Sequence, residues 1–167
     1  MKIRNAVKEE ILFIRKQRIR AYNDHEKLVP EDHFKALQKA ISSDADIQAG
    51  VELIVAEEGG IILGSVALVP PNSDAYEGFL DELNHAEIRL LAVDPEARGK
   101  GVGKALVNEC IQRTKQKNQT AIGLHTGEFM SSAIVLYESL GFVRCPEYDF
   151  EPANDGIIVK AFKLELT

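Results

Sequence analysis

The 167-residue sequence predicts a mixed α/β or α+β fold, because strand-like apolar runs alternate with amphipathic helices in the order β-α-α-β-β-β-α-β-α-β-β. Two apolar runs joined by Gly59-Gly60 predict an antiparallel hairpin. A later strand-helix-strand unit predicts a crossover connection between parallel strands. Hydrophobic content of 45% and charged content of 28% lie near the averages for globular proteins, so we expect one folded domain over residues 1–167.

The first half of the chain is predicted to hold a short strand at 2–5, two helices, and hairpin strands at 51–56 and 61–69. Spacings of three and four predict one face of the first helix, formed by Val7, Ile11, Ile14, Arg18 and Tyr22. The second helix is expected to begin near Pro30, with the apolar face Phe34, Leu37 and Ile41. The basic residues of the first helix are expected to point into solvent: Arg15, Lys16, Arg18 and Arg20.

The second half is predicted to alternate strands and helices up to its last residues. Strands are expected at 87–93, 121–125, 142–144 and 157–166. Helices are expected at 101–117 and 130–140, and Gly141 is placed to end the second of them in a left-handed conformation. A sheet that combines a hairpin with one crossover is expected to be mixed.

Charge and composition exclude several classes of protein. A total of 20 Lys and Arg against 26 Asp and Glu gives a net charge of −6, and the lack of a basic block argues against a nucleic-acid partner. No apolar run approaches the ~20 residues of a membrane span, and the N-terminus lacks an apolar leader. Cys110 and Cys145 are too few for a disulfide framework, and the histidines show no metal-ligand spacing. We therefore expect a soluble cytoplasmic protein without a metal site.

A glycine-rich turn, Arg98-Gly99-Lys100-Gly101-Val102-Gly103, follows a predicted strand and opens a predicted helix. Glycine permits positive φ and close approach of a ligand, so successive backbone N–H groups can face one anion at the helix N-terminus. Alternate glycines flanked by Arg98, Lys100 and Lys104 argue against a plain cap or hairpin turn. The turn matches neither the P-loop, whose hydroxyl position holds Ala105, nor the dinucleotide fingerprint, whose third glycine position holds Lys104.

Two separated motifs carry a family resemblance. The first is the strand at 88–93, followed by Asp94-Pro95 and by Arg98-x-x-Gly101-x-Gly103-x-x-Leu106. The second is Ala133-x-x-Leu136-Tyr137-Glu138-x-Leu140-Gly141-Phe142. Both, at this separation, resemble the motifs of GNAT N-acetyltransferases. The resemblance implies a GNAT-like central mixed, mostly antiparallel sheet of about seven strands with about four helices, splayed between the strands at 87–93 and 120–125.

The resemblance also implies that the turn holds the pyrophosphate of acetyl-CoA, the cosubstrate, through backbone amides. The residues concerned are Arg98, Gly99, Lys100, Gly101, Val102, Gly103 and Lys104. The pantetheine arm would pair with the backbone of Leu91, Ala92 and Val93, because an open strand edge offers N–H and C=O groups. Where many members carry a coenzyme-binding Asn, this chain has Met130. The alternative contact is Ser131 or Ser132, unless these serines only start the helix.

Acyl transfer from a thioester to an amine needs a base, an oxyanion donor and an acid. By resemblance Tyr137 would protonate the leaving thiolate; the alternative is a plain core tyrosine. Glu87 would be the general base, and its alternatives are a cross-strand ion pair or a chain of waters. His85 is a weaker candidate for a proton relay. Period-two alternation predicts one shared strand face for Glu87, Arg89, Leu91 and Val93.

These residues favour an acetyl-CoA-dependent N-acetyltransferase that acts by direct transfer to a primary amine in a ternary complex. A small-molecule acceptor is favoured over a protein N-terminus or lysine, and many relatives form homodimers, which makes a homodimer possible here. The acceptor walls are expected in the first two helices and in the loops at 72–83 and 148–151. A coenzyme A-binding regulatory module without useful catalysis and a nucleotide-binding protein are the alternatives.

Overall fold

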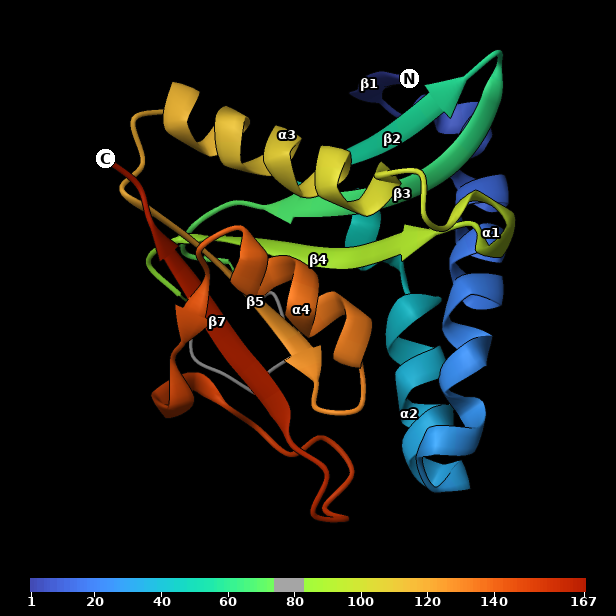
Figure 1. Cartoon of the computed structure of the whole chain (residues 1–167), viewed down its shortest axis with the longest axis vertical. Helices are drawn as coiled ribbons and strands as arrows, with labels where there is room; N and C mark the ends of the chain where they lie inside the picture. Colours follow the sequence, from blue (N-terminus) through green and yellow to red (C-terminus); the bar gives the residue numbers. More distant parts are fainter. Residues whose placement is uncertain (74–82) are drawn as a thin grey trace.

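A seven-stranded sheet forms the centre of the computed structural model, which describes residues 1–73 and 83–167 (Figure 1). The strands lie in the order β1-β2-β3-β4-β5-β7-β6. Their bounds are β1 Lys2–Asn5, β2 Glu52–Glu58, β3 Ile61–Val69, β4 Ala86–Val93, β5 Ala121–Gly127, β6 Val143–Arg144 and β7 Val159–Glu165. Neighbouring strands are antiparallel except β4 and β5, which are parallel. The predicted mixed, mostly antiparallel sheet is confirmed.

Helices cover both faces of this sheet. Their bounds are α1 Ile11–Tyr22, α2 Glu31–Ile41, α3 Val102–Gln116 and α4 Ser131–Ser139. Figure 1 shows α3 and α4 in front of the sheet, with α1 and α2 side by side at its right. Val66 and Leu68 of β3 pack in the cluster that contains α3, whereas Ala67 packs with α1 and α2. Because successive strand residues point to opposite faces, α1 and α2 cover the second face.

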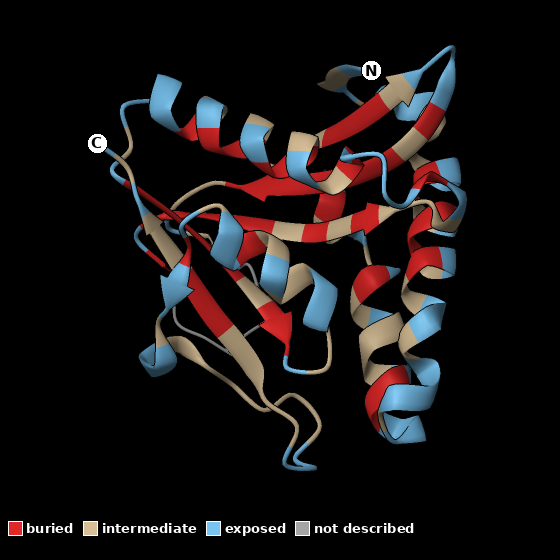
Figure 2. Ribbon diagram, in the orientation of Figure 1, coloured by how far each residue is buried: buried red, intermediate tan, exposed pale blue. Residues whose placement is uncertain are grey.

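The larger core lies between the sheet and helices α3 and α4. Figure 2 shows buried residues along β3, β4 and β5 and on the side of α3 that faces them. Leu106 and Cys110, four residues apart, form part of the predicted apolar stripe of α3. Tyr137 and Phe142 belong to the same cluster and anchor α4. None of the helices in the described ranges has both the length and the apolar character needed to cross a bilayer.

Strands β4 and β5 pair at three positions and then diverge. The pairs are Ala86 with Ile122, Glu87 with Gly123, and Ile88 with Leu124. Beyond them β4 continues to Val93 beside β3 alone, so within the described chain its other edge has no strand partner. The predicted splay between these two strands is therefore present.

A β-bulge at Leu90 changes which way the end of β4 faces. The register with β3 shifts here, and Leu90 has a φ of 60°. Its side chain packs with α1 and α2, whereas Leu91 and Val93 pack in the α3 and α4 cluster together with Ile88. An inserted residue shifts the strand alternation by one place. The predicted shared face is therefore wrong for Glu87, Arg89, Leu91 and Val93.

A buried ion cluster joins α1 to the 3-10 turn Asp44–Ile47 that follows α2. The buried carboxylate of Asp46 accepts hydrogen bonds from Arg15 at 2.7 Å and from Arg18 at 3.1 Å. Arg18 is 0% exposed and also donates to the carbonyl oxygen of Ile41 at 2.9 Å. Burial alone would raise the pKa of Asp46, but the two arginines outweigh it and hold the pKa below its usual range. The prediction of a solvated Arg18 is wrong, because Asp46 gives it an internal partner.

We expect Asp46→Ala to lower the free energy of unfolding by about 3–5 kcal/mol, because it leaves the buried Arg18 charge unpaired. Urea denaturation at neutral pH measures the loss. The stabilisation should be complete above about pH 4 and disappear as the pH falls through the lower folded pKa of Asp46. As a control, Glu31→Ala breaks an exposed 3.2 Å ion pair with Lys35 and should cost less than about 1 kcal/mol. Equal losses in both variants would contradict the expectation.

Candidate active site

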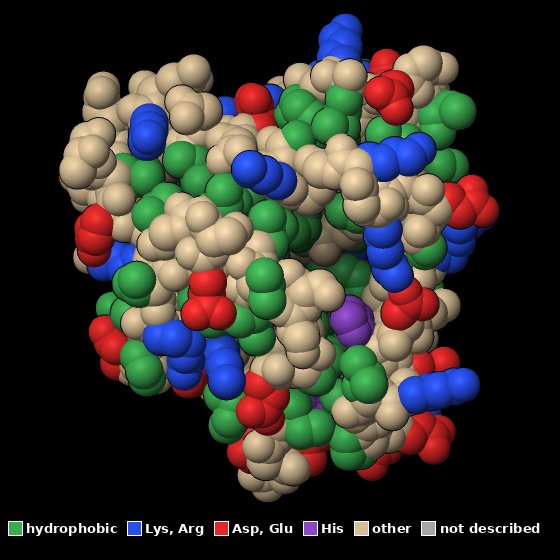
Figure 3. Space-filling model, viewed as in Figure 1, with side chains coloured by type: hydrophobic (Ala, Val, Ile, Leu, Met, Phe, Trp, Pro, Cys, Tyr) green, Lys and Arg blue, Asp and Glu red, His purple; other side chains and the backbone are tan. Residues whose placement is uncertain are grey.

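Three segments meet at the gap between β4 and β5: the end of β4, which has no strand partner on its β5 side, the glycine-rich turn into α3, and helix α4 (Figure 1). The three segments are in contact around Gly103 of α3. A Cβ atom added to Gly103 would lie 3.7 Å from the side chain of Val93 on β4 and 3.4 Å from that of Leu136 on α4. Figure 3 shows a hollow on this face, between the α3 and α4 side and the α1 side, with Lys and Arg side chains near its rim. The fold therefore brings the two sequence motifs together.

The glycine-rich turn presents a row of backbone N–H groups. Gly99 has a φ of 80°, and Gly101, the N-cap of α3, has a φ of 78°, a region in which a side chain would be strained. No side chain caps α3, and the N–H groups of Gly99 and of residues 101–104 donate to no other residue in the described chain. Such groups, aligned with the helix dipole, form a concavity for an anion. The turn therefore fits a phosphate group.

The three cations of this turn differ in their surroundings. The Arg98 guanidinium donates to Asp24 and, at 3.1 Å, to the carbonyl oxygen of Ala21. The hydrogen bond from Arg98 holds the pKa of Asp24 below its usual value and ties the turn to the end of α1. Lys100 and Lys104 are exposed and form no ion pair with a residue in 1–73 or 83–167. Their positive charge is therefore available to a ligand.

The end of β4 is held by a tyrosine from α1. The Tyr22 hydroxyl donates to the carbonyl oxygen of Leu91 at 3.0 Å. Burial raises the pKa of Tyr22, so the hydroxyl remains a donor. Ala92 and Val93 pair with β3 on the other edge. The sequence marks Tyr22 only as part of a helix face, because its partner lies 69 residues away.

Tyr137 lies on the buried side of α4. It is 5% exposed, and its ring meets Phe142 edge to face at a centroid distance of 6.1 Å. Burial raises the pKa of Tyr137 well above its ordinary value, and the nearby Tyr22 adds to the increase. The hydroxyl is therefore protonated at neutral pH and holds the proton that an acid role would require. The ring belongs to the core, so the core and acid interpretations concern different parts of one side chain.

Glu87 is 2% exposed and lies on the face of β4 opposite α3 and α4. Its Oε2 lies 3.2 Å from Nδ1 of His125, and its Oε1 lies 3.5 Å from Nδ1 of His85. Gly123 stands directly across the strand pair and leaves room for this group. A Cβ added there would lie 2.5 Å from Oε1 and 2.5 Å from the His85 ring. The sequence predicted roles for Glu87 and His85 but not for His125 and Gly123, which belong to no recognisable motif.

The start of α4 differs from the expected pattern. Met130 is the N-cap, and no side chain caps the helix. The Met130 sulfur accepts a hydrogen bond from the Thr126 hydroxyl at 3.3 Å, so its side chain turns toward β5. Ser131 and Ser132 are both exposed in the first turn. Ser132 is therefore accessible to a ligand at this helix end.

The structure describes only some of the segments expected to form the walls of the acceptor pocket. Helices α1 and α2 lie beside the end of β4, through Tyr22 and Leu90. Most of the 72–83 loop lies outside the described residues. In the loop at 148–151, the carbonyl oxygen of Tyr148 lies 2.8 Å from His125 Nε2, and the ring of Phe150 lies 5.5 Å from the His125 ring. This loop therefore borders the group around Glu87.

The two cysteines are free thiols. Burial raises the pKa of Cys110 to about 12 and that of Cys145 to about 11. Both thiols are therefore protonated at neutral pH and are weak nucleophiles. In the part of the chain that the structure describes, no three His, Cys, Asp or Glu side chains are grouped to hold a metal ion.

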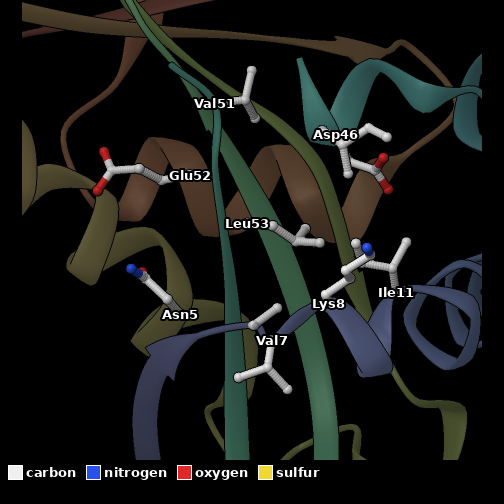
Figure 4. Close-up of a pocket in the computed structure, with 10 residues that line it drawn as sticks. Asn5, Val7, Lys8, Ile11, Asp46, Val51, Glu52 and Leu53 are labelled. Atoms are coloured by element: carbon white, nitrogen blue, oxygen red, sulfur yellow. The ribbon is translucent and has the colours of Figure 1, made fainter. Parts of the chain in front are cut away.

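A separate pocket of about 330 Å³ lies beside β1 and β2 (Figure 4). Val7, Ile11 and Leu53 line it together with the buried Asp46, whose carboxylate is already bound by two arginines. None of the residues predicted for catalysis or coenzyme binding lines this pocket. The gap between β4 and β5 is therefore the candidate site.

The sequence model of the acetyltransferase (GNAT) family matches residues 16–142. The chain belongs to this family. The match runs from α1 to the end of α4, so it includes the glycine-rich turn, the end of β4 and Tyr137. The resemblance predicted from the two motifs is confirmed.

A curated relative agrees with this GNAT membership. The "Probable N-acetyltransferase family 8 member 5" of Mus musculus is 34% identical over 94 residues. The alignment covers 56% of this chain and 39% of that protein, so the chain spans less than half the length of this relative.

Solved structures share the GNAT fold over nearly the whole chain. A GNAT acetyltransferase from Staphylococcus aureus Mu50 has a TM-score of 0.71 at 16% identity and covers 99% of both chains. The PaiA N-acetyltransferase from Thermoplasma acidophilum, solved in complex with coenzyme A, has a TM-score of 0.70 at 16% identity and covers 99% of this chain and 98% of its own. At these identities the likeness shows the fold.

We expect Gly123→Ala to lower the free energy of unfolding by about 1–3 kcal/mol, because the methyl group would overlap the Glu87 carboxylate and the His85 ring. Thermal and urea unfolding measure the change. The matched control is Gly103→Ala in α3, where the nearest atom is 3.4 Å away. That variant should keep its stability or gain up to about 1 kcal/mol. Equal stabilities of both variants would show that Gly123 is not needed for space.

Proposed function

We propose that this chain is an acetyl-CoA-dependent N-acetyltransferase that moves an acetyl group to a primary amine by direct transfer in a ternary complex. The observation that supports this most is the meeting, at one gap in the sheet, of the free N–H groups of Gly99 and residues 101–104 with the open edge of β4. A ligand with a diphosphate and an amide-bearing arm matches both features. GNAT membership and the coenzyme A complex of the PaiA enzyme point to acetyl-CoA as that ligand.

The pyrophosphate is proposed to lie at the turn into α3. It would accept hydrogen bonds from the backbone of residues 98–104, and Lys100 and Lys104 would offset its charge. The Arg98 guanidinium is engaged by Asp24. Arg98 would therefore contribute its backbone and hold the turn in place rather than contact phosphate through its side chain.

The pantetheine arm is proposed to lie along β4, where β5 has diverged. Its amides would pair with the backbone of Leu91, Ala92 and Val93 in place of a neighbouring strand. At the start of α4, Ser132 is exposed and would supply the polar contact that Met130 cannot. The coenzyme would thus touch both family motifs.

Glu87 and Tyr137 lie on opposite faces of the sheet, which supports separate acid and base roles. The acceptor ammonium would give a proton to Glu87, and its nitrogen would then form a bond to the thioester carbonyl carbon. An N–H of residues 91–93 would stabilise the resulting oxyanion. Collapse would break the C–S bond, and the thiolate would take a proton from Tyr137. The second proton that leaves the amine nitrogen would restore the Tyr137 hydroxyl, and Glu87 would release the first proton to solvent. The products are an amide and coenzyme A.

A small-molecule primary amine is the proposed acceptor. Glu87 is 2% exposed, so an acceptor must bring its amine into a buried position, which a slender molecule does most readily. A protein N-terminus or a lysine side chain is the alternative acceptor. A coenzyme A-binding regulatory module is the rival function, and the presence of both Glu87 and Tyr137 argues against it.

A thiol-release assay with acetyl-CoA and a panel of amines tests the function. We expect thiol release that depends on a primary amine, and the panel should include small amines, lysine peptides and peptides with free N-termini. Binding of acetyl-CoA without amine-dependent release across this panel would support the regulatory module. Affinity for ATP or NAD in place of coenzyme A would support a nucleotide-binding protein.

We expect Tyr137→Phe to reduce turnover by about 10²–10⁴-fold, because a positioned acid contributes that much. The affinity for acetyl-CoA should stay the same, since the ring and its packing remain. Steady-state kinetics and isothermal titration calorimetry measure the two quantities. Unchanged turnover would remove Tyr137 from the reaction.

We expect Gly101→Val to weaken acetyl-CoA binding by about 5- to 150-fold. Valine relaxes out of the left-handed conformation seen at a φ of 78°, and restoring it on binding costs about 1–3 kcal/mol. Gly101→Asn is the matched control, because asparagine visits this conformation more readily and should lose less affinity. If the valine variant binds as tightly as the unmodified chain, the turn is not the pyrophosphate site.

A further inference from the structure

Glu87 is flanked by His85, which directly precedes β4, and by His125 on β5, and all three side chains are buried. His85 is 6% exposed, Glu87 is 2% exposed, and the side chain of His125 is 1% exposed. Glu87 pairs with Gly123, so His125, two residues further along β5, points to the same face of the sheet. Little water reaches this group, so neighbouring side chains decide how the carboxylate is oriented.

The contacts of His125 fix its ring at both nitrogens. Nε2 lies 2.8 Å from the carbonyl oxygen of Tyr148, which can only accept, so Nε2 carries a proton. Nδ1 lies 3.2 Å from Oε2 of Glu87. Two lone pairs facing one another at that distance would repel. One proton therefore lies between Nδ1 and Oε2, and the base role proposed for Glu87 requires that Nδ1 carries it.

His85 has a different relation to Glu87. Its Nδ1 lies 3.1 Å from the carbonyl oxygen of Ala86 and donates to it. The distance from Nδ1 to Oε1 of Glu87 is 3.5 Å, which is long for a hydrogen bond. Its Nε2 is buried without a hydrogen-bond partner in the described chain. His125 therefore has the better geometry for orienting the carboxylate than His85, the histidine singled out by the sequence.

We propose that His125 is a positioning residue for Glu87, which it holds through Nδ1 while the Tyr148 carbonyl holds Nε2. This rests on the proposed function, in which Glu87 takes a proton from the acceptor amine. In that step an N–H bond of the ammonium breaks and an O–H bond forms at Glu87. His125 keeps its Nε2 proton and touches neither substrate. Since Tyr148 begins the loop at 148–151, His125 also links an expected acceptor wall to the base.

A double-mutant cycle separates positioning from a plain structural role. Glu87→Gln should lower kcat by about 10²–10⁴-fold. His125→Gln should lower kcat by about 10²-fold with an unchanged KM for acetyl-CoA, as expected for a carboxylate displaced by about 1 Å. The double variant should be no slower than Glu87→Gln alone, because His125 acts only through Glu87. Losses that multiply would overturn the proposal.

Two further variants control for geometry and stability. The amide nitrogen of Asn lies near the place of Nδ1 and that of Gln near the place of Nε2, so His125→Asn should retain more turnover than His125→Gln. Thr114→Val in α3 removes a buried 2.8 Å hydrogen bond to the Cys110 carbonyl oxygen and should leave kcat unchanged. Equal losses in the Asn and Gln variants, or an equal loss in Thr114→Val, would overturn the proposal.

Ring ¹⁵N NMR of His125 gives a readout that does not require turnover. We expect a protonated Nε2 and an Nδ1 shift that changes in Glu87→Gln. An Nδ1 shift that does not respond overturns the proposal. If the Glu87→Gln variant is slow but the His125→Gln variant is fully active, the proposed function remains intact and the positioning role of His125 is overturned. An Nδ1 response in a chain that releases no thiol with any amine shows that the proposed function has failed, and the catalytic role of His125 fails with it.

Discussion

The candidate site depends on one constraint, the early end of pairing between β4 and β5. These parallel strands share three residue pairs, and β4 then continues to Val93 with β3 on one side only. Backbone N–H and C=O groups are strong hydrogen-bonding groups that folded proteins seldom leave buried and unpaired. An internal strand edge of this kind is therefore a stable feature only beside water, a side chain or a ligand that can replace the missing strand. An amide-bearing ligand can replace it along the length of the gap.

The bulge at Leu90 gives this gap two chemically different sides. Because it shifts the alternation, Leu91 and Val93 join the core beneath α3 and α4, while Glu87 stays on the face of α1 and α2. A coenzyme approaching from the α3 side and an acceptor approaching from the other would meet at the strand end. Leucine seldom adopts a positive φ, so a leucine at this position gives no sequence signal for a bulge. It could not have been predicted from the sequence.

Features with a local signal could be predicted, whereas features that need a distant partner could not. The Gly59-Gly60 hairpin is confirmed because both glycines adopt positive φ, of 59° and 82°, within two residues of chain. The burial of Arg18 depends on Asp46, 28 residues away, and the hydrogen bond between Glu87 and His125 spans 38 residues. The roles of the candidate residues remain predictions, since family motifs supply the chemistry and the fold supplies only their positions.

Helix α1 explains how a strand end without a neighbour is kept in place. A strand that lacks an edge partner must be supported from its face, and α1 does this with polar side chains. Gln17, 3% exposed, donates to the carbonyl oxygen of Ile62 on β3, and Tyr22 donates to that of Leu91 on β4. Arg98, in the glycine-rich turn, donates a hydrogen bond to the carbonyl oxygen of Ala21 near the end of α1. Because one helix touches both the strand and the turn, the two halves of the proposed coenzyme site keep a fixed separation. The inward polar residues Gln17 and Tyr22 of α1 therefore support the two strands beside the open edge.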